Sequence, residues 1–188
     1  MAAAVNDYYD VQAALLAAAA AALDAIPSFP GQDDLQGAPD RQGVVPPGQI
    51  VMDCAQLVVA GQSISEMQTG PVGPNPLAGK RHVTGRLSTY GVQIMVTRDC
   101  IPIGTTSGRT YTPPTMAEQS FAARQLNADG KALWDGLFIR MADEDIDLMS
   151  RCEQVFWDAM NSVGPLGAHA GWILNLRVRL AGYRHEPT

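Results

Sequence analysis

The residue types best suited to chemistry in this sequence are cysteine and histidine, which together can form a nucleophilic Cys–His pair. There are three of each, at Cys54, Cys100, Cys152, His82, His169 and His185. The partners of such a pair meet in space and not in sequence, so a small cytosolic Cys–His enzyme stays open as a remote alternative. The spacing does not match a zinc site. Three distant cysteines give no disulfide framework either, and we interpret them as free, mostly buried thiols in a reducing cytosol.

The other motif-like stretches each lack an essential residue. Asp143, Asp145 and Asp147 resemble the start of a calcium loop, but Gln154 stands where the bidentate glutamate should be. The stretches GRLSTYG and TTSGR do not match the G-x-S-x-G turn of serine hydrolases, and GTTSGRT lacks the lysine of a phosphate loop. We therefore assign no catalytic, cofactor-binding or metal-binding residue, and we expect a protein that is not an enzyme and uses no cofactor.

A different kind of candidate site lies near the end of the sequence, in GWILNLRVRLAG. Apolar residues from Trp172 to Leu180 alternate with Arg177 and Arg179, which predicts a strand with one buried face and one arginine-bearing face. These arginines could bind an anion, pair with carboxylates of a partner, or face water. An anion site is disfavoured because the net charge is −6 and the 13 Lys and Arg residues are spread along the chain. We predict Arg177, Arg179 and Trp172 as candidate contacts between subunits, since arginine forms directional pairs with carboxylates.

The first element expected along the chain is a helix over residues 5–26, favoured by its run of alanines. We interpret it as a packing helix of the core, with a contact between subunits as the alternative. Asp7 and Asp10 precede the alanine run and no Lys or Arg does, which argues against a signal peptide. Asp24 interrupts the apolar stretch before it reaches the length of a membrane span, so we expect a soluble, cytosolic protein with no membrane partner.

Two β-rich segments, 49–67 and 82–100, are expected to pair as antiparallel strands. Gly61 is expected to mark a bulge or bend in the first of them, because glycine in a strand interior often does so. In the second segment apolar residues alternate from Tyr90 to Val96, which predicts one buried face.

Two helices are expected next. The first begins after Thr115, which forms a capping box with Glu118. The second is expected over about 143–163, where apolar residues recur at three- and four-residue spacing. Trp134 and Trp157 are interpreted as core anchors. Together with the final strand, this order predicts an α+β fold in which an antiparallel or mixed sheet is flanked by an N-terminal helix and two central helices.

Three stretches rich in Pro and Gly, 27–48, 69–81 and 101–114, are expected to form extended loops. We expect one domain over residues 1–188. The hydrophobic fraction is 46%, but aromatic residues make up only 6% and alanine supplies much of the rest. This composition favours a thin core that gains further stability by association.

Four segments, MDCAQLVV, VQIMVTRDCIPIG, YTPPTMAEQ and ALWDGLF, resemble a family of small neck proteins from long-tailed phages of actinobacterial hosts. The resemblance spans roughly residues 49–182, and its motifs are short and structural. The matching residues are Asp53, Cys54, Gln56, Leu57, Cys100, Pro102, Pro113, Pro114, Thr115, Ala132, Leu133 and Trp134.

The order of elements is similar to that of tail terminator proteins. The resemblance implies a homo-oligomeric ring in the virion, expected to be a hexamer, that caps the tail tube and joins it to the head connector. The implied partners are further copies of the chain, the major tail tube protein and the head-tail stopper or connector protein. DNA is expected to pass through the acidic lumen without specific binding. A head-tail adaptor or stopper is the alternative within the same structural class.

Overall fold

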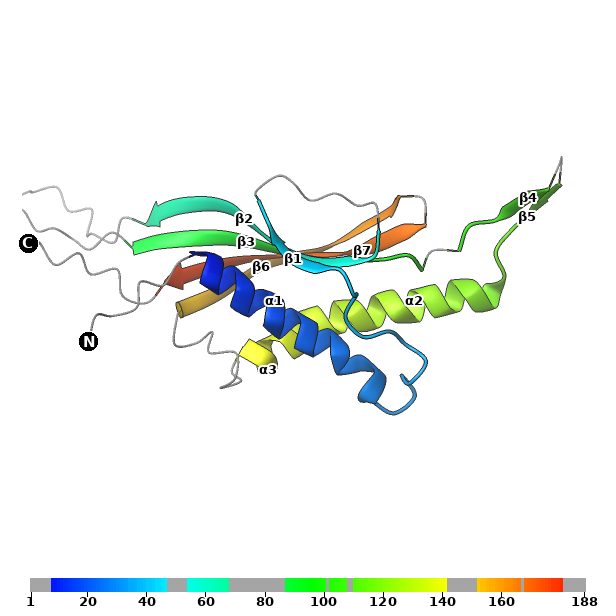
Figure 1. Ribbon diagram of the computed structural model, residues 1–188, viewed down its shortest axis with the longest axis horizontal. Helices are drawn as coiled ribbons and strands as arrows, with labels where there is room; N and C mark the ends of the chain where they lie inside the picture. The colour runs from blue at the N-terminus through cyan, green and yellow to red at the C-terminus, as the bar shows by residue number, and fades with distance from the viewer. Residues whose placement is uncertain are drawn as a thin grey trace, which may run out of the picture.

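A computed structural model of the chain describes residues 8–46, 54–67, 87–100, 102–107, 110–141, 152–166 and 168–180. Within them, one sheet of five strands is covered on one face by helices (Figure 1). The strands lie in the order β1 (Gln42–Val45), β2 (Gln56–Met67), β3 (Leu87–Arg98), β7 (His169–Leu180) and β6 (Cys152–Leu166). β1 pairs with β2 in parallel and the other neighbours are antiparallel, so the sheet is mixed.

The helices are α1 (Tyr8–Asp24), the short 3-10 turn η1 (Ile26–Ser28), α2 (Met116–Lys131), the π-helical turn η2 (Ala132–Gly136) and α3 (Leu137–Met141). The predicted fold class is therefore confirmed, an α+β fold with a mixed sheet flanked by an N-terminal helix and two central helices, although α2 and α3 both lie within the first of the two central helices that were expected. The core lies between these helices and the inner face of the sheet. Its fully buried side chains include Val11, Leu15, Leu23, Leu57, Val59, Val92, Ile94, Val96, Leu133, Leu137, Leu174 and Val178.

Helix α1 packs inside the subunit, as predicted. Its alanines give it a smooth surface, and Ala18, Ala19 and Ala22 are buried along with its larger side chains. Gly136 of η2 approaches Ala22 so closely that a Cβ there would lie 3.4 Å from the alanine Cβ. By length and composition the stretch Tyr8–Ser28 could cross a membrane, but half of it is buried inside this fold, as is common for a core helix.

The predicted bulge at Gly61 is confirmed, and the structure gives its reason. The register of β2 against β3 shifts between Gly61 and Ser63. The buried hydroxyl of Tyr90 accepts a hydrogen bond of 2.7 Å from Gln12 at this point. A Cβ at Gly61 would lie 1.8 Å from that hydroxyl oxygen, so only glycine leaves room for the Tyr90 side chain.

The predicted capping box at the start of α2 is also confirmed. Thr115 accepts a hydrogen bond from the backbone N–H of Glu118, and the Glu118 carboxylate accepts one of 2.8 Å from the backbone N–H of Thr115. These bonds satisfy backbone donors that the first helical turn leaves free. Hydrogen bonds from Thr115 lower the pKa of Glu118, because they stabilise its charged form.

The helix predicted over 143–163 is wrong from residue 152 onward, where the chain forms the edge strand β6; residues 142–151 lie outside the described part. Register shifts interrupt β6 between Cys152 and Gln154 and again around Asp158. Inward-facing positions are therefore separated by three, two and three residues, and apolar side chains at these intervals resemble the helical period. The inward side chains are Cys152, Val155, Trp157 and Met160.

Two of the three predicted loops contain short strands. Stretch 27–48 includes β1, which adds a parallel edge to β2. Stretch 101–114 includes β4 (Thr105–Ser107) and β5 (Thr110–Thr112), which pair as a separate two-stranded sheet. Both corrections have one physical reason: strands of three or four residues fit between the prolines and glycines that exclude longer elements. The predicted loop 69–81 lies outside the described residues.

Candidate functional site

A hairpin projects from the body of the molecule, beyond the ends of the main sheet and α2 (Figure 1). We call its described residues, 102–107 and 110–114, the arm. Every residue of β4 and β5 is exposed. The arm therefore has no hydrophobic core of its own to maintain its shape, and an isolated two-stranded hairpin is only marginally stable in water. Its projection makes it a candidate for contact with another chain.

The described residues of the arm carry no charged side chain. Its large apolar side chains are exposed, Ile103 to 62% and Tyr111 to 61%. The Tyr111 ring lies on Gly104, where a Cβ would meet the ring at 2.4 Å. Because Gly104 has no side chain, the Tyr111 ring has room to lie against the opposite segment of the hairpin, and this contact sets the orientation of the ring. An uncharged surface with an oriented tyrosine has the composition of an interface core.

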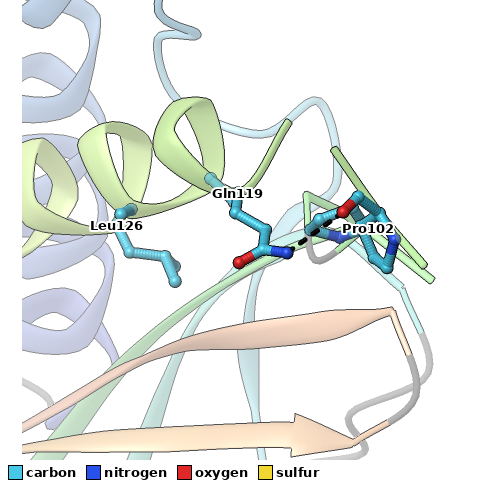
Figure 2. Close-up of a pocket in the computed structure, with 6 residues that line it drawn as sticks. Pro102, Gln119 and Leu126 are labelled. Atoms are coloured by element: carbon cyan, nitrogen blue, oxygen red, sulfur yellow. Dashed lines mark hydrogen bonds between the residues drawn. The ribbon is translucent and has the colours of Figure 1, made fainter. Parts of the chain in front are cut away.

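An apolar pocket of about 410 Å³ lies at the root of the arm (Figure 2). Pro102 and Pro114 line it from the arm, and side chains of α2 line it from the other side, among them Gln119 and Leu126. Gln119 donates a hydrogen bond of 3.2 Å to the carbonyl oxygen of Pro114. The prolines restrict the backbone where the arm leaves the body, so the arm starts from a stiff base.

A buried ion pair fixes the strand that leads into the arm. Arg98, near the end of β3, donates two hydrogen bonds to the Asp129 carboxylate of α2, at 2.9 and 2.8 Å. Gln125 donates a third at 3.0 Å and also exchanges hydrogen bonds with the backbone of Gln36. Burial raises the pKa of Asp129, and the bonds from Arg98 and Gln125 oppose that rise. The network joins β3, α2 and the segment before β1.

A second exposed surface lies on η2 and α3. Trp134, Phe138 and Ile139 are exposed to 44%, 65% and 68%; we call them the aromatic patch. The prediction that Trp134 and Trp157 are core anchors holds for Trp157, which packs against the core, but is wrong for Trp134. The two indoles meet edge to face at 5.6 Å. The π-helical turn offsets the helix phase at Trp134, and this offset turns its side chain toward the edge strand.

The strand predicted from GWILNLRVRLAG is confirmed as β7, and Arg177 and Arg179 lie on its face away from the helices. Arg177 donates hydrogen bonds of 2.8 Å to both carboxylate oxygens of Asp158. Asp158 is the bulged residue of β6, so the bulge directs its carboxylate toward Arg177. These hydrogen bonds raise the pKa of Arg177. The acidic partner expected from another subunit is thus present in this chain, next to Phe156, whose ring lies 5.7 Å from the guanidinium.

The other two predicted contact residues also bind within the subunit. Arg179 donates a hydrogen bond of 3.3 Å to the side chain of Gln154. Trp172 faces the helices, and its indole N–H donates to the carbonyl oxygen of Leu126 at 2.6 Å. Gly130 leaves the space that this indole needs. A role of Arg177, Arg179 and Trp172 in contacts between subunits stays a prediction.

The cysteines and histidines do not come together among the described residues. Cys152 is buried, and burial raises the pKa of Cys100, which keeps its thiol protonated and poorly nucleophilic. His169 pairs with Asp99, the residue before Cys100, and among the described residues no hydrogen bond or ion pair is found between His169 and a cysteine. In this part of the chain there is also no group of three or more side chains that could hold a metal ion. His82, His185 and the run Asp143, Asp145 and Asp147 lie outside the described residues.

Sequence reasoning missed the arm and the aromatic patch, although each had a signal. The arm is encoded by two threonine-rich runs around the turn dipeptide Ser107–Gly108, a recognisable hairpin pattern. The patch is encoded by LFIRM, in which apolar residues occupy more of the helix circumference than one buried face needs, with Arg140 on the remaining side.

Comparison with known proteins gives no relative, because neither a protein-family model nor a curated protein matches the chain.

Proposed function

We propose that this protein is a structural subunit of the neck of a long-tailed phage of an actinobacterial host, with the tail terminator as its position. In that role copies of the chain form a closed ring that caps the tail tube and joins it to the head connector. The sequence motifs described above suggest the family, and the structure supplies one observation that favours an assembly role. That observation is the arm, an exposed hairpin whose described residues carry no charge and which extends from the body.

The arm supports an assembly role because the exposure of its apolar side chains to water is energetically unfavourable. A short hairpin of this kind gains its stability by packing on another surface. The thin core supports the same conclusion, since many of the buried side chains contributed by α1 are alanines. The net charge of −6 suits a ring through which DNA moves, because an acidic wall repels the phosphate backbone.

The proposal is tested on the purified protein and on virions together. Size-exclusion chromatography with light scattering at high concentration should give a ring mass, and negative-stain images should show a ring with a central hole. Purified virions should contain the chain, and particles made without it should carry tails of uncontrolled length. A protein that stays monomeric at high concentration and is absent from virions would contradict the proposal.

A head-tail adaptor or stopper is the second candidate, because the motifs identify the neck more securely than a place within it. Labelling the chain in assembled particles separates the two: a terminator contacts the tail tube protein, whereas an adaptor contacts the portal side. A Cys–His enzyme has little structural support, because the raised pKa of Cys100 disfavours its thiolate.

A further inference from the structure

We propose that the arm of one subunit docks on the aromatic patch of the next subunit. The inference rests on the ring function proposed above, and it names the two surfaces that close the ring. One is the arm with Ile103 and Tyr111, and the other is formed by Trp134, Phe138 and Ile139.

The receiving surface belongs to a helix that is apolar on both sides. Leu137 and Met141 of α3 are buried in the core, whereas Phe138 and Ile139 of the same helix are the ones left in water. Apolar residues on a second side of a helix are normally covered as well, and in α3 only Arg140 interrupts them. The described contacts bury only one side of α3, so its outer side is the part that an assembly would cover. Trp134, supported by Trp157, extends this surface toward β6.

The arm has the chemistry to cover such a surface. It presents Ile103 and the oriented ring of Tyr111, together with threonine side chains whose methyl groups are apolar and whose hydroxyls can bond to backbone groups. Its described residues carry no charge that would have to be desolvated on an apolar patch; Arg109, the one charged residue in the sequence of this hairpin, lies outside them. Tyrosine and tryptophan are the residues most enriched in the energetic centre of protein interfaces. The arm therefore fits the patch better than an acidic or basic surface would.

The two surfaces lie on different parts of the molecule. In Figure 1, β4 and β5 form one extremity of the long axis, whereas α3 lies beneath the far part of the sheet, at the other end of the helical run that α2 begins. The arm cannot reach the patch of its own subunit. A contact between two different surfaces is heterologous, and such contacts repeat from copy to copy until a ring closes. Each subunit would give one arm and receive one.

The size of the patch agrees with an anchoring contact. A fully accessible aromatic side chain presents about 150–250 Å² and an isoleucine somewhat less, so at their exposed fractions the three patch residues leave roughly 300–400 Å² of apolar surface in water. This lies at the lower end of the roughly 300–600 Å² of the largest patch on a typical monomer, and is about half of the roughly 800 Å² that each partner buries in a stable interface. The arm and patch thus form the centre of a subunit contact, and neighbouring surfaces form its rim.

The contact is tested by cross-linking the intact protein. Tyr111 is replaced by a photoreactive benzoylphenylalanine, and light and isotope-labelled copies are mixed before irradiation. We expect cross-links that join position 111 of one chain to residues 134–141 of a chain with the other label. In parallel, Phe138→Ser, Ile139→Ser and Tyr111→Ser should each weaken ring assembly at least about 30-fold, as expected for residues in an interface centre. Their melting temperatures should stay close to that of the wild type, because the side chains are exposed.

Phe29→Ser is the matched control, since Phe29 is exposed to 57% but lies outside both surfaces. It should leave assembly unchanged. If the wild type forms rings and the Phe138 and Ile139 variants assemble equally well, the docking inference is wrong and the ring function stands. Cross-links only within one chain, or only to the tail tube protein in assembled particles, would also overturn it. A wild type that never forms a ring would overturn the ring function and the docking together.

Discussion

Replacing Arg98 by methionine should be among the most destabilising substitutions in this chain. Arg98 and Asp129 are exposed to only 2% and 0%, and the arginine supplies two of the three hydrogen bonds that Asp129 accepts. Without Arg98, a buried carboxylate keeps only its bond to Gln125. Breaking a buried pair from one side costs about 3–5 kcal/mol. In a chain of this length that lowers the melting temperature by roughly 6–20 °C.

The measurement is urea unfolding followed by far-UV circular dichroism, with two comparison variants. Arg124→Met breaks the exposed pair of Arg124 with Asp34 and should cost at most about 1 kcal/mol. Arg98→Met combined with Asp129→Leu should be closer to the wild type than Arg98→Met alone, because no buried charge is then left without a partner. If Arg98→Met costs no more than Arg124→Met, the reasoning about this network is refuted.

Acid provides an independent readout of the same variant. Burial raises the pKa of Asp129 above its usual 3.8, and loss of Arg98 removes the main opposing influence. In Arg98→Met the folded state should therefore bind a proton more readily than the unfolded state. A raised folded pKa contributes stability that is present at low pH and lost as the pH rises through that pKa. The stability deficit of the variant should shrink as the pH is lowered from 7 toward 4.

Three further substitutions test other parts of the structure. Gly61→Ala places a Cβ 1.8 Å from the Tyr90 hydroxyl and should cost about 1–3 kcal/mol in urea unfolding, with partial recovery when Tyr90→Phe is added. Thr115→Ala removes the cap of α2 and should cost about 1 kcal/mol. The hydrogen bonds from Thr115 lower the pKa of Glu118 from 4.5, so their contribution to stability is present above pH 4.5 and is lost as the pH falls in acid. This acid-induced loss of stability should be smaller in the variant. Arg177→Glu with Arg179→Glu should leave the subunit folded by circular dichroism but impair assembly; unchanged assembly would mean that these arginines serve only the subunit's own sheet.

The central strands could be predicted from sequence because nothing interrupts their alternation. In β3 and β7 the inner residues recur at every second position, as with Val92 and Ile94 in one and Leu174 and Leu176 in the other. These strands pair with each other along their length without a bulge, so the inner face keeps the two-residue period, although in β3 Met95 and Thr97 on the other face are buried as well. The capping box of α2 was predictable for a similar reason, since its hydrogen bonds join residues close in sequence.

The edge strand and the candidate site could not be predicted because they depend on contacts between distant residues. The bulges in β6 form only when the strand pairs with β7, and they displace its apolar residues into a helix-like spacing. The partner of Arg177 is the bulged Asp158, which the alternation of β7 alone cannot identify. Similarly, LFIRM carries apolar residues on two sides of a helix, and only the packing of α3 shows which of them is left in water.

The buried network and the proposed docking surface are connected by the position of the arm. Arg98 ends β3 directly before the segment that leads into the arm, and α2 begins directly after it. The bond from Arg98 to Asp129 therefore fixes the end of β3, the first stem of the arm, to the C-terminal part of α2, and the prolines at the root of the arm restrict the backbone of both stems. A projecting segment with fixed stems loses less conformational freedom on docking than a free loop does. Arg98→Met should consequently weaken ring assembly even at temperatures where the subunit is fully folded, whereas Arg124→Met should not.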